Sequence, residues 1–373
     1  MIVRSLEGTI KAQLFKNKVI LLLGARQTGK TTLLKKIAKE NEAVLWLNGD
    51  EYDIQQRFAN ATSTQLKAMI GNHKMVMIDE AQRIDNIGLC LKLIHDTYPE
   101  IQLIVTGSSS FELRNKTNEP LTGRKFENQL FPISYSEMVT HHTELIETRH
   151  LNSRLVFGYY PEIITNEGNE IELLKLLSDS FLFKDILMLD TIKKPEKLVK
   201  LLQALSFQIG SEVSYNEIGN LIGLDSKTVE AYVNLLEKSF IIFKLNSFNR
   251  NLRSELKMAK KIYFYDNGIR NALISNFQMI EARQDVGALF ENFLVSERMK
   301  FNHYYKNYAN AYFWRTKEQQ EIDYLEEKNG QLSAFEFKWN ANKKIKFTKT
   351  FTNAYPRATT HLISHQNISD FLL

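Results

Sequence analysis

A lysine and a threonine stand among glycines directly after the apolar run Val19–Leu23, with a spacing that suits phosphate binding. Residues 24–31 read GARQTGKT, which is the P-loop pattern G-x-x-x-x-G-K-[ST]. Glycines let backbone N–H groups wrap around phosphates, and the helix that follows offers its positive amino end. We expect Lys30 to reach the β- and γ-phosphates of a bound nucleotide and the Thr31 hydroxyl to ligate Mg²⁺. The predicted nucleotide-binding residues are Gly24, Ala25, Arg26, Gln27, Thr28, Gly29, Lys30, Thr31, Thr32, Asp79 and Ser108.

Two further apolar runs end in polar residues that complete such a site. The first, MVMIDEAQRI, places Asp79 where a Mg²⁺-holding carboxylate is expected and Glu80 where a water-orienting base is expected. The alternative is an acidic pair that merely caps the strand. The second run, IQLIVTGSSS, ends in the hydroxyls of Thr106, Ser108 and Ser109. One of these hydroxyls contacts the γ-phosphate or the attacking water, or else the hydroxyls cap the helix that follows. Both interpretations stay open.

A third constellation lies near the other end of the chain, where residues 321–339 read EIDYLEEKNGQLSAFEFKW. The Asn-Gly pair inside it is a strong signal for a two-residue hairpin turn. With that turn, one face of the hairpin carries the cross-strand pairs Asp323 with Glu336 and Glu321 with Lys338. Facing carboxylates repel each other, so this pattern predicts a cation between Asp323 and Glu336.

The cation has two candidate identities. A divalent metal suits paired carboxylates, and with an adjacent lysine it would activate water and stabilise a pentavalent phosphate. The predicted order of helix, three strands, helix and strand resembles the restriction-endonuclease-like core. Asp323 and Glu336 with Lys338 then match its D…(D/E)-x-K signature, and Glu291 matches its helical acid. Alternatively, Lys338 neutralises the pair itself, with Glu321 as a further partner and no metal.

The elements that must position these residues predict an α/β chain with three domains. Residues 1–140 form a P-loop nucleotide-binding domain, whose continuous apolar runs are typical of a buried parallel sheet. Residues 141–275 form a helical linker and a winged helix, and residues 276–373 form the restriction-endonuclease-like domain.

The winged-helix prediction depends on a helix-turn-helix followed by two strands. Ser214 caps a helix to Ile222, Gly223 makes the turn, and Asp225 or Ser226 caps the second helix. The second helix offers few early cations for DNA. The loop between the strands is better supplied, with Arg250, Arg253, Lys257, Lys260 and Lys261, and later lysines follow at Lys343, Lys344, Lys346 and Lys349. DNA binding and packing against a protein surface are both open.

Several ordered motifs resemble the prokaryotic AAA-type ATPases that carry a C-terminal domain of unknown function, relatives of the archaeal-ATPase branch of signal-transducing NTPases. They are GARQTGKTTLL, MIDEAQ, VTGSSS, LTGRKFENQLFPISYSEM and GYYPEI, within a match from about residue 15 to 345. The resemblance implies that residues 1–140 form an AAA-type ATP-binding domain and that the nucleotide is ATP rather than GTP. It also implies that Arg124, in the L-x-G-R motif, senses or polarises the γ-phosphate in cis or across a subunit boundary. The other interpretation is a pairing of Arg124 with a carboxylate.

The composition limits the cellular compartment and the class of protein to be expected. The chain has 373 residues, a net charge of +5 and one cysteine, so no internal disulfide forms and a reducing, cytoplasmic compartment is expected. No signal peptide or membrane span is indicated. We therefore expect an ATP- and Mg²⁺-dependent ATPase that switches or drives a DNA-engaging C-terminal half, with or without nuclease activity. The alternative is a nucleotide-switched scaffold for protein partners, and an oligomer is compatible with both.

Overall fold

The computed structural model describes residues 2–108, 113, 116–181, 194–249, 260–342 and 347–373. The chain divides into two compact units. Unit 1 comprises Met1–Ile133 with Lys238–Phe240, and unit 2 comprises Ser134–Glu237 with Ile241–Leu373. Among the helices of this described part, none is long and apolar enough to cross a membrane.

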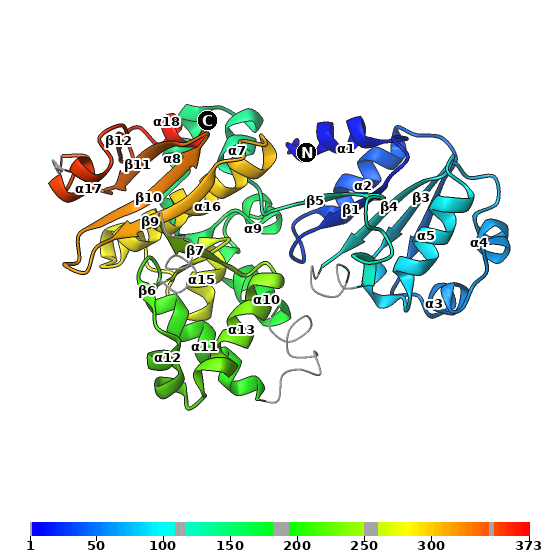
Figure 1. Cartoon of the computed structure of the whole chain (residues 1–373), viewed down its shortest axis with the longest axis horizontal. Coiled ribbons are helices and arrows are strands. Elements are labelled where there is room, and N and C mark those ends of the chain that lie inside the picture. Colours follow the sequence, from blue (N-terminus) through cyan, green and yellow to red (C-terminus); the bar gives the residue numbers. More distant parts are fainter. Residues whose placement is uncertain (1, 109–112, 114–115, 182–193, 250–259, 343–346) are drawn as a thin grey trace. The chain divides into compact units, whose positions relative to one another are not determined.

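Unit 1 is built on a parallel five-stranded sheet with the strand order β2-β3-β4-β1-β5 (Figure 1). The strands are β1 (Val19–Leu23), β2 (Val44–Asn48), β3 (Met75–Asp79), β4 (Gln102–Gly107) and β5 (Lys125–Gln129). All residues of β1, β3 and β4 are buried, as expected for the centre of a sheet covered on both faces. The carboxyl ends of these three strands therefore meet along one edge, where the predicted site residues follow them.

The helical elements of unit 1 are α1 (Leu6–Gln13), α2 (Lys30–Lys39), α3 (Tyr52–Phe58), α4 (Ser63–Ile70), the 3-10 turn η1 (Ala81–Arg83) and α5 (Ile87–Thr97). Just before α1, the buried Arg4 ties two segments together. Its guanidinium donates to Thr28 O and to Phe131 O, each at 2.6 Å. The loop before α2 is thus fastened to the segment that leaves β5.

The helices of unit 2 are α7 (Tyr135–His141), α8 (Glu144–Phe157), α9 (Pro161–Thr165), α10 (Glu170–Phe181), α11 (Pro195–Phe207), α12 (Tyr215–Ile222), α13 (Ser226–Lys238), α15 (Asn267–Leu273), the 3-10 turn η3 (Ile280–Ala282), α16 (Val286–Tyr304), α17 (Lys349–Ala354) and α18 (Ser369–Leu372). The predicted helix-turn-helix is present. Ser214 caps α12 through the N–H of Glu217, Gly223 adopts the left-handed conformation, and Asp225 accepts from the N–H of Thr228.

A single seven-stranded sheet runs through unit 2 in the order β12-β11-β10-β9-β7-β8-β6. Its strands are β6 (Glu212–Val213), β7 (Ile242–Ser247), β8 (Lys260–Phe264), β9 (Asn310–Arg315), β10 (Glu321–Lys328), β11 (Gln331–Phe337) and β12 (Thr359–Ile363). The β7–β8 hairpin joins the C-terminal strands because β7 pairs with β9 in parallel. Residues 250–259, which make up most of the basic loop between β7 and β8, lie outside the described residues. Lys343, Lys344 and Lys346 do so as well.

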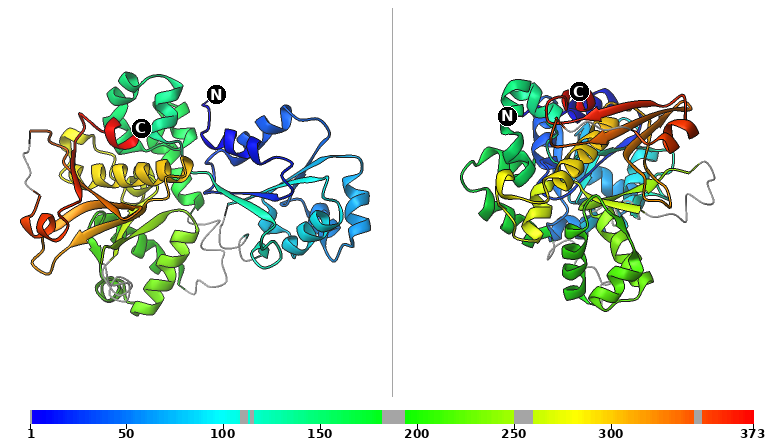
Figure 2. Two further views of the ribbon diagram at one scale, coloured as in Figure 1. Left: turned by 45° about the horizontal axis from the view of Figure 1, so that its top comes forward. Right: turned by 90° about the vertical axis from the view of Figure 1, so that its left-hand side faces the viewer.

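The β10–β11 hairpin has the predicted register. Lys328 pairs with Gln331 across the turn, and the pairing continues to Tyr324 with Phe335. The predicted succession of α16, three strands, α17 and β12 is also present, and β12 pairs with β11 in parallel. Helix α16 lies along the sheet and contacts both β8 and β11 (Figure 2).

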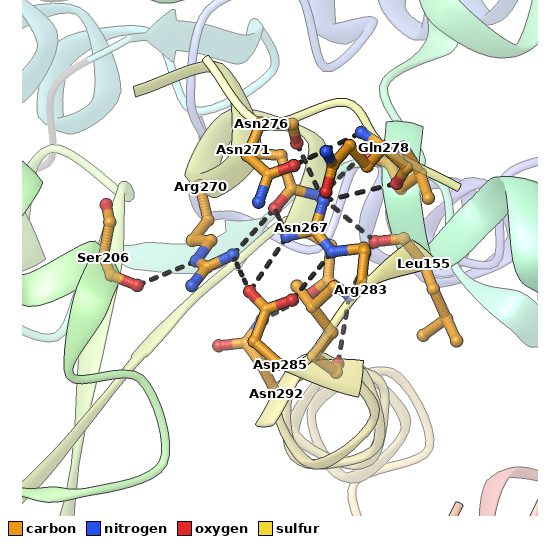
Figure 3. Close-up of polar contacts among 12 residues, drawn as sticks. Leu155, Ser206, Asn267, Arg270, Asn271, Asn276, Gln278, Arg283, Asp285 and Asn292 are labelled. Carbon is orange, nitrogen blue, oxygen red and sulfur yellow. Dashed lines mark hydrogen bonds and ion pairs between the residues drawn. The ribbon is translucent and has the colours of Figure 1, made fainter. Parts of the chain in front are cut away.

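A buried polar network joins α8, α15 and the start of α16 (Figure 3). Asp285 accepts hydrogen bonds from both Arg270 and Arg283, with the Arg270 contact at 2.7 Å and the shortest Arg283 contact at 2.8 Å. The amide of Asn271 donates to Val156 O at 2.8 Å. The fully buried Asn292 donates to the side chain of Asn267 at 2.7 Å. Because buried polar groups are costly unless paired, this network fixes how these helices pack.

Candidate functional site

The P-loop of unit 1 forms as predicted at the carboxyl end of β1. Gly29 has φ +94°, a left-handed conformation that favours glycine, and it precedes the first residue of α2. The side chain of Thr28 is buried and donates to Ala25 O at 2.9 Å, which closes the loop. The ammonium group of Lys30 donates to Gly24 O and to Ala25 O, each at 2.8 Å. Lys30 therefore lies folded over the loop that is expected to hold phosphates.

The carboxylate of Asp79 lies between two hydroxyls. Thr31 donates to Asp79 Oδ2 at 2.7 Å, and Thr106 donates to Asp79 Oδ1. The end of β3, the end of β4 and the first turn of α2 are thereby brought together. A threonine hydroxyl beside a carboxylate supplies adjacent hard oxygen ligands, which fits Mg²⁺.

Glu80 follows in a left-handed conformation, with φ +49°, which is unusual for a residue with a side chain. Its N–H donates to Thr106 Oγ1 at 3.1 Å. Its carboxylate Oε2 accepts from Gln82 Nε2 at 2.5 Å and from Ser108 Oγ at 3.2 Å. Thr106 and Ser108 therefore contact the two acids directly, and Ser109 lies outside the described residues. The contact of Gln82 with Glu80 was not predicted, although Gln82 lies within the MIDEAQ motif.

Arg124 lies at the other end of the sheet. Its carbonyl accepts from the N–H of Val19, the first residue of β1, and its side chain donates to Asp96 Oδ1 at 2.7 Å. The P-loop follows Leu23, the last residue of β1, about 13 Å further along at the usual rise of a strand. A cis contact of Arg124 with the γ-phosphate does not fit this placement, and the pairing with a carboxylate is the contact present. A role across a subunit boundary stays a prediction.

In unit 2, the predicted acids of the C-terminal hairpin do lie beside a lysine. Lys338 Nζ is 3.2 Å from Glu336 Oε2 and 3.6 Å from Asp323 Oδ2. Asp323 also accepts from the N–H of Phe337 at 2.8 Å. Glu321 does not share Lys338; it pairs with Lys261 and Arg315 instead.

Lys261 of β8 is the residue that sequence reasoning missed in this cluster. It is fully buried, and it donates to Glu291 Oε1 at 3.0 Å and pairs with Glu321. The hydroxyl of Tyr263 donates to the same oxygen of Glu291 at 2.7 Å. Within the described residues, no group of three or more His, Cys, Asp and Glu side chains is arranged to hold a metal ion. The metal roles of Glu291, Asp323 and Glu336 stay predictions.

The charged groups of this cluster shift one another's pKa values. Burial, and next the charge of Asp323, raise the pKa of Glu336 to about 7. Burial raises the pKa of Glu291 to about 7, against the opposing charge of Lys261. Burial alone would lower the pKa of Lys261, but Glu291, Glu321 and Asp323 outweigh it and raise that pKa. Burial alone would also lower the pKa of Lys338, but Asp323 and Glu336 outweigh it and raise that pKa, so both lysines are charged near neutral pH.

Three family models match successive parts of the chain. Residues 16–139 match the family described as AAA domain. Residues 148–279 match a domain of unknown function, DUF8612, and residues 286–369 match a second, DUF4143. These segments follow one another along the chain, and the second and third both lie in unit 2.

Similar proteins span most of the chain. An uncharacterized protein of Methanocaldococcus jannaschii, MJ1544, is 23% identical over 342 residues, which covers 85% of this chain and 74% of its own. Another, Rv2008c of Mycobacterium tuberculosis, is 23% identical over 347 residues, covering 92% and 75%.

Among solved structures, the Walker-type ATPase PABY2304 of Pyrococcus abyssi is similar at a TM-score of 0.51 and 16% identity, and the match covers 74% of this chain and 96% of that one. An identity this low shows likeness of fold alone. The parallel sheet, the P-loop and the family match together define unit 1 as an AAA-type P-loop ATPase fold.

Proposed function

We propose that unit 1 binds ATP with Mg²⁺ and hydrolyses it. The observation that carries this proposal is the contact of Thr31 and Thr106 with the two oxygens of Asp79 beside the P-loop. Backbone N–H groups of residues 24–31 hold the phosphates, and Lys30 turns from its carbonyl partners to the β- and γ-phosphates. Thr31 and Asp79 would hold Mg²⁺, which would supply neutralisation of charge on the phosphate oxygens.

In the proposed reaction, Glu80 orients a water for attack on the γ-phosphorus and accepts its proton. The bond from the γ-phosphorus to the bridging oxygen breaks, and ADP and inorganic phosphate leave. Glu80→Gln keeps the size of the side chain and removes the base. We expect this variant to bind ATP with wild-type affinity and to lose turnover by about 100-fold or more. Wild-type turnover in Glu80→Gln would assign the water to another residue.

A second part of the proposal concerns unit 2. We propose that its helix-turn-helix and β7–β8 hairpin form a winged helix, and that α16 to β12 form a restriction-endonuclease-like core. Support comes from the order of the elements and from the proximity of Asp323, Glu336 and Lys338. In this proposal the nucleotide state of unit 1 switches how unit 2 engages double-stranded DNA.

Steady-state ATP turnover during a titration with double-stranded DNA tests this switch. Stimulation that fades as salt is raised would support contacts between lysines and phosphates. A flat response with ATP still hydrolysed would favour the second candidate, a scaffold for protein partners with an inactive nuclease-like core. Assembly into a ring upon addition of ATP would support a role for Arg124 across a subunit boundary, and a strict monomer would contradict it.

The proposed metal site of unit 2 has its own test. Calorimetry measures Mn²⁺ binding to the wild type and to Asp323→Ala. Mg²⁺ and a non-hydrolysable ATP analogue occupy Thr31 and Asp79 in both proteins, so that the Mn²⁺ binding measured lies outside the ATP site. Loss of a binding step in Asp323→Ala would support a metal between the hairpin acids. Unchanged binding would leave Lys338 as their cation.

A further inference from the structure

We infer that Gln82 is a positioning residue for ATP hydrolysis, holding the carboxylate of Glu80 in the orientation that receives the water. This inference rests on the proposed ATPase function and deepens it. Gln82 Nε2 donates to Glu80 Oε2 at 2.5 Å and to Ser108 Oγ at 3.1 Å. Ser108 Oγ in turn donates to the same Glu80 oxygen at 3.2 Å. The three side chains form a closed ring of hydrogen bonds.

The direction of this ring is fixed by chemistry. An amide oxygen facing the Glu80 carboxylate at this distance would be repelled, so Nε2 must occupy the position beside it. The Ser108 hydroxyl can then accept from Gln82 and donate to Glu80. Oε2 of Glu80 is thereby occupied by two donors. The other oxygen, Oε1, contacts no donor among the described residues and is the one left to accept from the water.

Gln82 is itself held firmly. Gln82 is only 4% exposed, and its backbone carbonyl accepts from Lys116 Nζ at 2.6 Å. Its amide oxygen packs over Gly107, where an added Cβ would lie 3.0 Å from that oxygen. Glu80 needs such support, because its left-handed backbone is disfavoured for a residue with a side chain. The ring joins the segment after β3 to the end of β4.

The side-chain amide oxygen of Gln82 also supports a functional role for this residue. Among the described residues it is buried and has no hydrogen-bond partner. An unpaired buried acceptor next to a proposed base is costly for stability alone and is expected where function requires the residue. A packing role would be served better by an apolar side chain of the same shape. The amide group is therefore retained for what its Nε2 does to Glu80.

The test is Gln82→Leu, which keeps the bulk of the side chain and removes the donor. We expect kcat for ATP to fall by about 10- to 100-fold, because a base that is free to rotate spends less time in the reactive orientation. ATP affinity, measured by equilibrium binding, should stay within about twofold of the wild type because Gln82 does not contact the P-loop. Gln102→Leu is the matched control. Gln102 is equally buried but lies at the opposite end of β4, and its replacement should leave kcat unchanged.

A double variant separates positioning from packing. If Gln82 acts through Glu80, then Gln82→Leu should cause no further loss of residual turnover in the Glu80→Gln background. Additive losses would overturn the inference, as would wild-type kcat in Gln82→Leu or a parallel loss of ATP affinity. If Gln82→Leu fails to fold, Gln82→Met offers a flexible replacement without a donor and carries the same expectations. Absence of turnover in the wild type would overturn both this inference and the proposed function, whereas a normal Gln82→Leu would overturn this inference alone.

Discussion

Replacement of Lys338 by methionine tests which cation holds the hairpin acids together. The variant keeps the length of the side chain and removes the ammonium group that lies 3.2 Å from Glu336 and 3.6 Å from Asp323. Lys338 is 29% exposed at its side chain, so solvent screens part of the interaction. We expect a loss of stability in unit 2 whose size depends on pH.

The sign follows from the pKa of Glu336, which burial and Asp323 raise to about 7 from an ordinary value of 4.5. The folded state then holds a proton that the unfolded state releases, so stability falls as pH rises through the interval between these values. Lys338 opposes that rise, and its removal moves the pKa higher still. Each further unit costs about 1.4 kcal/mol once the glutamate is ionised. We expect Lys338→Met to lose about 1 to 2 kcal/mol more at pH 8.5 than at pH 5.5.

Urea unfolding followed by tryptophan fluorescence measures this difference. In a Trp46→Phe background, the remaining signal comes from Trp314 and Trp339, which both lie in unit 2. Lys328→Met is the control, because Lys328 is exposed on the same hairpin and its ammonium group donates to Asn307 rather than to an acid, and it should change stability by less than about 0.5 kcal/mol at either pH.

An equal loss for Lys338→Met at both pH values would refute the reasoning, because it would mean that the ammonium does not stabilise the ionised glutamate. The same unfolding curves at pH 8.5 with and without Mn²⁺ give a second comparison. Recovery of stability with Mn²⁺ would mean that a metal can take the place of the ammonium group.

Three further changes test packing and anchoring. Arg4→Met should destabilise unit 1 by about 2 to 4 kcal/mol, because two buried charged hydrogen bonds are lost, and thermal unfolding with and without ATP would also reveal weaker binding. Gly158→Ala should cost unit 2 about 3 kcal/mol or more by urea unfolding, since φ is +75° and the new Cβ would lie 2.1 Å from the buried carboxylate of Asp266. Asn292→Leu should cost about 2 to 3 kcal/mol in the same assay, because the N–H of Phe264 loses its acceptor in a fully buried position.

The parts of the fold that short sequence signals specify were predictable. The P-loop is one continuous motif between a buried strand and a helix, and the structure forms both. The hairpin register followed from its Asn-Gly turn, because a two-residue loop leaves only one pairing for the flanking strands. The caps of α12 and α13 were likewise local, since Ser214 and Asp225 bond to N–H groups three residues ahead.

The parts that depend on distant pairing were not predictable. Lys261 reaches the hairpin acids only because β7 pairs with β9, and no local pattern records that contact. The place of Arg124 in the sheet was not predictable for the same reason, since a motif gives neighbours along the chain and not the end of the sheet on which a residue lies. Gln82 was visible in a quoted motif, but its contact with Ser108 required the spatial order of β3 and β4.

The parallel pairing of β7 with β9 also limits how such chains can be rearranged by recombination or protein engineering. The two segments of unknown function are matched separately, up to residue 279 and from residue 286. A break between them would open a sheet at its centre, leaving two edges of unpaired N–H and C=O groups that invite association with other chains. It would also divide the Asn267–Asn292 pair, whose members lie in the two segments. Modules that look separable by sequence should therefore be inherited, expressed and exchanged together.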